Sequence, residues 1–245
     1  MENALLVGLS AQIALRRSMD VVANNVANIS TGGFKRENPL FESVLASVDS
    51  ENRVGGQSEV AFVRDYGLMR DLNAGPMEQT GGPLDMAIDG SAYFTVQTAN
   101  GDRFTRDGHF KMDQTGRLVT MTGDPVMGEG GPIALPTTAR DIKIAKDGTV
   151  STESGQVGKI RLAAFANERA LRTEGDNLFA SDEPALAAPS ARLQQGMLER
   201  SNVQGVSEMT KMIEIMRAYQ SVSETLSQTE DTYKRAAQKL GEVKA

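Results

Sequence analysis

The chain has 245 residues, 40% of them apolar and 24% charged, which suits a folded protein with one large domain or two modest ones. The net charge of −6 argues against nucleic-acid binding, because proteins that bind nucleic acids usually present a basic face. There is no cysteine, which excludes disulfide bonds, thiolate metal sites and cysteine nucleophiles.

The N-terminal segment, residues 3–27, is predicted to be a helix with one narrow apolar face. Such a helix is marginal alone in water, so we expect it to need a partner helix. The segment has no basic start, and no run of 18 apolar residues occurs in the chain, so we expect neither a cleaved secretion signal nor a membrane span. The apolar residues at helical spacing are Leu5, Leu6, Leu9, Ile13, Met19, Val22 and Val26.

The stretch at residues 23–35 is predicted to end this helix. Gly32 and Gly33 permit a positive φ angle, so the chain can turn there. Asn25 and Asn28 are three residues apart and would share one helix face. One interpretation is a simple helix terminus followed by a turn. The other is that these amides hydrogen-bond to a neighbouring helix or subunit and fix the register between them.

The middle of the chain is predicted to contain a connector and a β-rich domain. Residues 35–80 are weakly patterned, and we expect an extended connector there. Residues 81–195 contain short alternating segments, typical of strands. Asn100-Gly101 and Asp147-Gly148 lie between such segments and favour tight hairpin turns. The pattern therefore predicts an antiparallel sheet.

The C-terminal part is predicted to be one long helix over residues 203–240, about 57 Å in length. Ser201 is the expected N-cap, with Gln204 three residues later. A long helix with a narrow apolar stripe favours a coiled-coil partner, and the N-terminal helix is the partner that we expect. The stripe consists of Val206, Met209, Ile213, Met216, Tyr219, Val222, Leu226, Tyr233 and Leu240.

The predicted fold class is therefore α+β, with long N- and C-terminal helices paired as a coiled coil and a central antiparallel β-rich domain inserted between them. The predicted boundaries are 1–34, 35–80, 81–195 and 196–245. Apolar helix faces that the pair leaves open would bind other copies of the chain, giving a filament. The residues predicted to form this assembly interface are Leu5, Leu9, Ile13, Val22, Asn25, Val26, Asn28, Val206, Met209, Ile213, Met216, Tyr219 and Leu226.

The sequence does not predict a catalytic site. The single histidine, His109, follows a turn and is expected to be an exposed loop residue. Asp85 and Asp89 would lie about 13 Å apart on one strand, beyond the roughly 5–9.5 Å that separates glycosidase carboxylates. We therefore predict a protein that is not an enzyme and binds no cofactor or metal. The alternatives are a scaffold or adhesin-like protein and, more remotely, a peptidoglycan-acting enzyme.

Four motifs occur in order along the chain: NNVANISTGGFK at 24–35, GGPLDMAIDG at 81–90 with YFTV at 93–96, FTRDGHF at 104–110 with DQTGRLV at 113–119, and LERSNV at 198–203 with MIEIMRAY at 212–219. These motifs resemble those of the flagellar axial proteins, which are the rod, hook and hook-associated subunits of the bacterial flagellum. The chain length and GGPIALP at 130–136 are most similar to proximal rod subunits, with distal rod subunits as the close alternative.

This resemblance implies a structural subunit of the basal-body rod that polymerises helically in the periplasm. The terminal helices would form the inner tube and the β-rich domain would face outward. Such subunits leave the cytoplasm through the flagellar type III export apparatus, without a cleaved signal peptide. The implied partners are proximal and distal rod subunits, other copies of the same chain and the export apparatus. The implied role is to transmit motor torque and to let later subunits pass.

Overall fold

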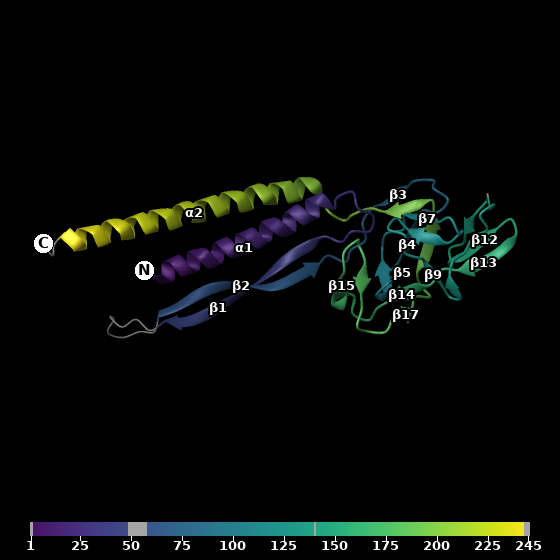
Figure 1. The fold of residues 1–245 in the computed structure, drawn as a ribbon, viewed down its shortest axis with the longest axis horizontal. Coiled ribbons are helices and arrows are strands. Elements are labelled where there is room, and N and C mark those ends of the chain that lie inside the picture. The colour runs from purple at the N-terminus through teal and green to yellow at the C-terminus, as the bar shows by residue number, and fades with distance from the viewer. Residues whose placement is uncertain (1, 49–57, 140, 243–245) are drawn as a thin grey trace. The chain divides into compact units, whose positions relative to one another are not determined.

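The computed structural model describes residues 2–48, 58–139 and 141–242. Helices α1 (Glu2–Ala27) and α2 (Gly205–Glu242) flank a middle part that is rich in β-strands (Figure 1). This arrangement confirms the predicted α+β class with a helix at each end. The chain divides into two compact units. The first contains α1, α2 and a hairpin of two long strands, and the second contains residues 28–36 and 71–203.

In the first unit, α1 and α2 pack side by side and run in opposite directions (Figure 1). Near the N-terminus of α1, a Cβ atom added to Gly8 would lie 2.5 Å from Leu226 Cδ2, so the missing side chain lets the helices approach closely. Over their described residues, neither helix is long and apolar enough to cross a membrane. One face of α2 has a half-buried or buried residue every three or four positions: Glu208, Met212, Ile215, Tyr219, Val222, Leu226, Thr229 and Tyr233.

The start of α2 differs from the prediction. The helix begins at Gly205, and its first hydrogen bond runs from the Glu208 N–H to the Gln204 carbonyl (3.0 Å). Ser201 does not cap the helix. Its side chain is buried, and its hydroxyl accepts a hydrogen bond from the Val203 N–H (3.2 Å). The serine therefore stabilises the turn before the helix. Serine side chains commonly bond to nearby backbone groups in this way instead of capping a helix.

Residues 37–48 and 58–70 are extended, but they pair with each other rather than forming a single connecting segment. Strands β1 (Glu37–Val48) and β2 (Ser58–Arg70) are antiparallel, with a shift in register between Leu40 and Phe41. An ion pair from Arg17 Nε to Asp65 Oδ2 (3.0 Å) joins α1 to β2. The part of the expected connector at residues 49–57 lies outside the described residues.

The second unit is built around a six-stranded antiparallel sheet in the order β15-β16-β6-β5-β14-β17. A hairpin forms where Asn100-Gly101 predicts one, but its two turn residues are Ala99 and Asn100, because Thr98 pairs with Gly101. Gly101 is the first residue of β6 and has a φ angle of 101°. The strands of this sheet are β5 (Tyr93–Thr98), β6 (Gly101–Thr105), β14 (Leu162–Ala164), β15 (Arg172–Thr173), β16 (Phe179–Ala180) and β17 (Leu186–Ala187).

Smaller antiparallel ladders surround this sheet, namely β3-β19, β4-β18, β7-β8, β9-β10 and β11-β12-β13. A single 3₁₀ turn, η1 (Glu168–Ala170), lies between β14 and β15. The strands of these ladders are β3 (Met77–Gln79), β4 (Met86–Asp89), β7 (Phe110–Met112), β8 (Leu118–Thr120), β9 (Met127–Gly128), β10 (Gly131–Pro132), β11 (Lys143–Ile144), β12 (Thr149–Thr152), β13 (Gly155–Lys159), β18 (Arg192–Gln195) and β19 (Met197–Glu199).

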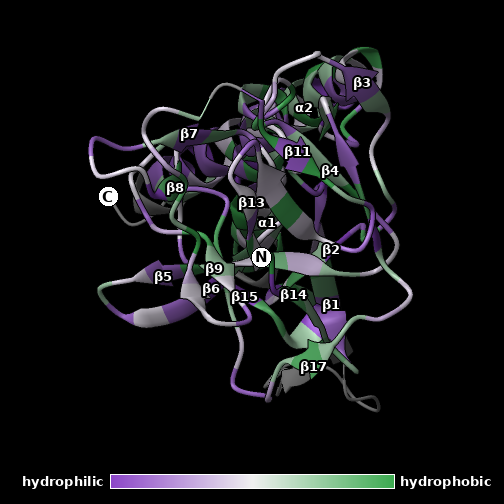
Figure 2. Ribbon diagram, turned by 90° about the vertical axis from the view of Figure 1, so that its right-hand side faces the viewer, coloured by the Kyte–Doolittle hydropathy of each residue, from purple (hydrophilic) through white to green (hydrophobic). Residues whose placement is uncertain are grey.

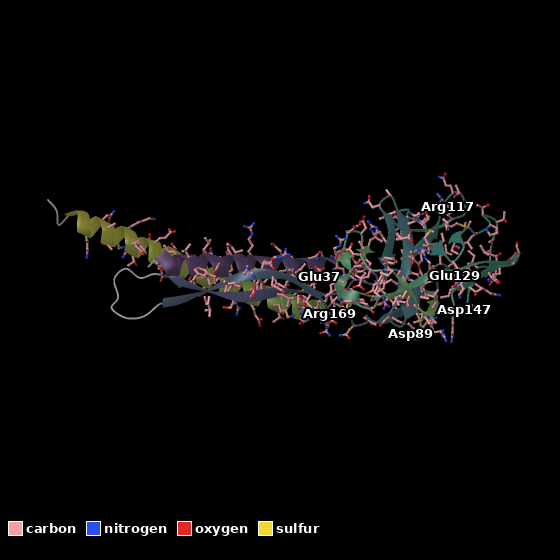
Figure 3. All side chains as sticks on the ribbon, turned by 90° about the horizontal axis from the view of Figure 1, so that it is seen from below. Glu37, Asp89, Arg117, Glu129, Asp147 and Arg169 are labelled. Carbon is pink, nitrogen blue, oxygen red and sulfur yellow. The ribbon has the colours of Figure 1, made fainter. Side chains whose placement is uncertain are left out.

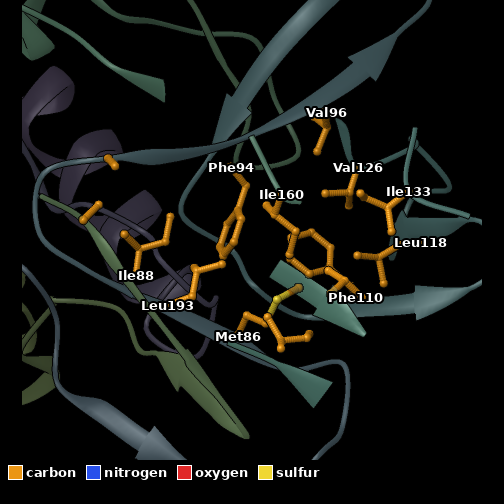
Figure 4. Close-up of a cluster of buried hydrophobic side chains, with 14 of the residues drawn as sticks. Met86, Ile88, Phe94, Val96, Phe110, Leu118, Val126, Ile133, Ile160 and Leu193 are labelled. Carbon is orange, nitrogen blue, oxygen red and sulfur yellow. The ribbon is translucent and has the colours of Figure 1, made fainter. Parts of the chain in front are cut away.

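The hydrophobic core of the second unit contains side chains from β4, β5, β7, β8, β11, β12 and β18 and from the segments between strands (Figure 4). Phe94 and Phe110 meet edge to face, with ring centroids 5.0 Å apart. A smaller cluster on the other side of β5 includes Tyr93, Phe104 and Phe165. Hydrophobic and hydrophilic residues both occur along the ribbons of this unit (Figure 2), and β5 is buried on both faces, at Tyr93 and at Phe94.

Candidate assembly site

A second apolar stripe on α2 lies outside the seam that packs on α1. Its members are three and four residues apart, and helix geometry places them roughly 110° around α2 from that seam. Contiguous exposed patches of this kind mark contact sites for other proteins. The stripe consists of Val206 (83% exposed), Met209 (55%), Ile213 (53%) and Met216 (45%).

The N-terminal half of α1 carries a shorter apolar stripe. Leu6, Leu9 and Ile13 are 51%, 50% and 60% exposed. The same face becomes polar further along, at Arg16 and Asp20. Next to Leu9, a groove of about 390 Å³ opens between the two helices, and its lining includes Leu226. The first unit therefore offers both apolar surface and a hollow to another molecule.

The predicted interface residues fall into three groups in the structure. One group is exposed: Leu9, Ile13, Val206, Met209, Ile213 and Met216. A second group is half-buried: Leu5, Val26, Asn28, Tyr219 and Leu226. Val22 and Asn25 are buried. The first group is thus available for contacts with other molecules, whereas the buried residues serve packing within the chain.

Asn25 links three elements of the first unit. Its Nδ2 donates to the Glu37 carbonyl (2.8 Å) and to Glu208 Oε2 (3.1 Å), and its Oδ1 accepts from the Glu37 N–H (2.9 Å). The side chain is 1% exposed. The partners found for this amide are therefore β1 and α2 of the same chain. Buried amides satisfied in this way specify one arrangement of their neighbours.

Asn28 stabilises the turn that follows α1, in the second unit. Its Oδ1 accepts from Thr31 Oγ1 (3.0 Å), and its carbonyl accepts from the Thr31 N–H (3.2 Å). The two glycines that follow pack closely on residues 106 and 107. A Cβ atom on Gly32 would lie 2.8 Å from Asp107 Oδ1, and one on Gly33 would lie 2.5 Å from the Arg106 carbonyl carbon. Two of the sequence motifs therefore meet at this turn.

The turn also meets the fourth motif, at Glu199. This side chain is fully buried, and its Oε1 contacts Lys35 Nζ at 2.5 Å while its Oε2 lies 3.3 Å from Arg106 Nη1. Arg106 also donates to the Gly90 carbonyl (2.7 Å) and lies over the Tyr93 ring. Burial lowers the pKa of Lys35 from its ordinary value of 10.5, and Glu199 opposes that shift. The amino-acid sequence carries no local signal of this cluster, because its members are far apart in the chain.

Burial also perturbs Asp107, beside the same turn. Desolvation raises the pKa of this carboxyl from 3.8, and the nearby Asp85 adds to the effect, while His109 opposes it. A raised pKa in the folded state favours the protonated form. Its contribution to stability is therefore fully present below pH 3.8 and is lost as the pH rises through the folded-state pKa.

We expect Asp107→Asn to gain stability relative to the natural chain as the pH rises from about 4 to about 7. The asparagine keeps an acceptor for the His109 N–H, which bonds to Asp107 Oδ1 at 3.0 Å. Urea unfolding at several pH values measures this difference. Asp113→Asn is the control, because hydrogen bonds, above all the one from Thr115, lower the pKa of Asp113. That variant should lose stability relative to the natural chain as the pH rises toward 3.8. A difference for Asp107→Asn that does not change with pH would contradict the assignment.

The hairpin of the first unit exposes further large apolar side chains. Leu45 is 63% exposed and Tyr66 is 70% exposed, while Leu68 and Met69 are each 41% exposed. None of these residues was predicted to belong to an interface, because residues 35–80 were expected to be only a connector. The sequence signal nearest to them is the short apolar run from Val60 to Val63, which is typical of a strand.

Asp85 and Asp89, considered as a pair of catalytic carboxylates, lie in different surroundings. Asp85 is buried and accepts from Thr80 Oγ1 (2.6 Å), with His109 Nδ1 at 2.7 Å from its other oxygen. Asp89 is exposed at the end of β4. Charged side chains project from many parts of the second unit, for example Arg117, Glu129 and Asp147 (Figure 3). Among the described residues, no three acidic or histidine side chains are grouped to hold a metal.

Three family profiles match the chain in an order that follows its architecture. The profile described as flagella basal body rod protein matches residues 5–35, which cover most of α1 and the turn. The flagellar hook protein FlgE/F/G D1 domain matches residues 87–152 in the second unit. The flagellar basal body rod FlgEFG protein C-terminal profile matches residues 194–239, which cover β19 and most of α2.

Similar proteins match over nearly the whole chain. The flagellar basal-body rod protein FlgF of Caulobacter vibrioides is 42% identical, covering 99% of this chain and 100% of the relative. FlgF of Mesorhizobium japonicum is 34% identical, over 98% of this chain and 99% of the relative. FlgG of Buchnera aphidicola subsp. Acyrthosiphon pisum is 33% identical, over 94% and 96%. With both terminal helices and the β-rich middle included in these matches, the chain belongs to the family of flagellar basal-body rod proteins.

Proposed function

We propose that this protein is a structural subunit of the proximal part of the bacterial flagellar rod and that it polymerises helically through its terminal helices. The rod role follows from its family. The proximal position is favoured over the distal one, because the FlgF relative named above is 42% identical whereas the FlgG relative is 33% identical. Its expected partners are other proximal and distal rod subunits and further copies of itself.

The observation that carries this proposal is the exposed stripe Val206, Met209, Ile213 and Met216. The adjacent face of α2 already packs on α1, so the stripe remains for a neighbouring subunit. In the assembled rod we expect α1 and α2 to pair as a coiled coil, consistent with the three- and four-residue spacing of their contact seam. Two methionines in the stripe would adapt to non-identical neighbours, because their side chains are flexible.

Export through the flagellar type III apparatus, without a cleaved signal peptide, is part of the same proposal. The subunit would then reach the periplasm as an unfolded chain and fold at the growing end of the rod. Its terminal helices would line the inner tube, and the second unit would lie further out. In this role the protein would transmit torque and let later subunits pass, without catalysing a reaction.

A strain whose only copy carries Met209→Lys and Ile213→Lys tests the proposal. Both side chains are more than half exposed, so we expect the isolated chain to keep its fold. Two charges in an apolar contact should prevent assembly, and the cells should export the subunit but lack rods and not swim. Electron microscopy of isolated basal bodies and swimming assays measure this result.

The matched control is Ser207→Lys with Ser221→Lys, which adds the same charge to exposed positions on the other side of α2. These cells should swim normally if only the stripe contacts a neighbour. Normal swimming of the Met209→Lys and Ile213→Lys strain, with normal protein levels, would refute a role of the stripe in assembly.

A further inference from the structure

The last two strands of the second unit, β18 and β19, each pair with a strand that lies much earlier in the sequence. Strand β18 pairs with β4, which places Leu193 in the main core at 1% exposure. Strand β19 pairs with β3, so that Leu198 lies opposite Glu78. The partners in each ladder are more than a hundred residues apart in sequence. We name residues 192–203 the closing segment.

The closing segment also supplies the counter-charge for two buried cations. The side chains of Lys35 and Arg106 are 2% and 5% exposed, and both contact the Glu199 carboxylate. Glu199 Oε1 accepts from the Gly75 N–H as well (3.0 Å), and the Glu199 carbonyl accepts from the Gly33 N–H (2.7 Å). Before Glu199 arrives, this place would hold two positive charges away from water, which is strongly unfavourable.

Asn202 ties the remaining chain segments together. Its Oδ1 accepts from the Arg36 N–H (2.7 Å), and its Nδ2 donates to the carbonyls of Asp71 (2.9 Å) and Asn73 (3.0 Å). Residues 36, 71 and 202 all lie close to points where the chain passes from one unit to the other. One amide therefore joins three of the four connections between the units, on the side of the second unit.

We propose that the closing segment is a latch for the second unit: the β-rich fold forms only when Glu199 and Asn202 join residues 33–36 and 71–75. A chain that is released N-terminus first therefore keeps its β-rich part open until residue 203 has emerged. The same segment leads directly into α2 at Gly205, so closing the latch also fixes the start of the helix. This inference concerns folding and stands apart from the proposed role in the rod.

Hydrogen exchange of the full chain carrying Glu199→Gln tests the latch. The substitution preserves the shape of the side chain and removes the negative charge between Lys35 and Arg106. We expect amide exchange to rise on the order of 100-fold throughout the second unit, including Phe94 and Val96 in the central strand β5. Faster exchange confined to residues 75–79 and 197–203 would overturn the proposal.

Glu78→Gln is the matched control, because Glu78 pairs with Arg200 on the same β3-β19 ladder but the two side chains are about half exposed. We expect exchange in β5 to stay within about threefold of the natural chain in that variant.

A measurement on the natural chain covers the case in which the Glu199→Gln variant does not fold. During refolding from urea, pulsed hydrogen exchange should show Phe94 and Val96 becoming protected in the same kinetic phase as Arg200, whose N–H bonds to the Pro76 carbonyl at 2.9 Å. Protection of β5 in an earlier phase than Arg200 would refute the latch, because the sheet would then form without the closing segment.

Discussion

Replacing Asn25 with alanine should destabilise the first unit by about 2–4 kcal/mol. The side chain makes three hydrogen bonds, two to the Glu37 backbone and one to Glu208 Oε2. Each buried group left unsatisfied costs on the order of 1–3 kcal/mol. The gain in helix propensity from alanine offsets only a few tenths of a kcal/mol. Urea unfolding followed by the helical circular dichroism signal measures the loss.

The neighbouring Asn24 provides the control. Its side chain is exposed and donates to Glu37 Oε2 at the longer distance of 3.4 Å. We expect Asn24→Ala to change the free energy of unfolding by less than about 0.5 kcal/mol. Equal urea midpoints for the two variants would show that the hydrogen bonds of the Asn25 side chain do not stabilise the first unit.

This result would also settle which interpretation of the asparagine pair applies. From the sequence, amides that bond to another subunit would leave the isolated protein stable and would affect only assembly. The structure gives Asn25 partners inside the chain, so the isolated protein should already be weaker. Loss of swimming in an Asn25→Ala strain would then follow from a poorly folded first unit as well as from any lost contact between subunits.

Local chemistry explains what could be predicted from the sequence. The β5-β6 hairpin follows from a local turn signal at Asn100-Gly101, although its turn residues are Ala99 and Asn100. The helices follow from apolar spacing over many residues, which is a strong signal. Their ends were less certain, and the predicted cap at Ser201 was wrong, because a buried hydroxyl found a partner at Val203 instead.

Contacts between distant residues explain what could not be predicted. The periodicity of α2 marks nine apolar positions but does not say which of them face α1. Glu208 is buried because Asn25 faces it, whereas Val206 is 83% exposed because nothing in the described part of the chain covers it. The Glu199 cluster joins residues that are 164 and 93 positions apart. Neither pairing leaves a pattern in a single sequence.

Replacing Gly33 with alanine is the second substitution that should strongly destabilise the protein, because it brings both backbone strain and a steric clash at one position. Its φ angle is +65°, a conformation in which a side chain costs about 1–2 kcal/mol. In addition, an alanine Cβ would lie 2.5 Å from the Arg106 carbonyl carbon, and backbone atoms there have little room to move. We therefore expect Gly33→Ala to destabilise the second unit by about 3–5 kcal/mol in total.

Gly81→Ala separates the two costs. Gly81 has a similar φ angle of +72°, but an added Cβ would meet no atom within 4 Å. That variant should show the conformational cost alone, about 1–2 kcal/mol. For both variants, urea unfolding monitored through hydrogen exchange of the β5 amides measures the stability of the second unit. Because the Gly33 N–H also bonds to the Glu199 carbonyl, displacing Gly33 should loosen the closing segment as well. Equal losses for the two alanines would mean that the turn after α1 does not pack on Arg106.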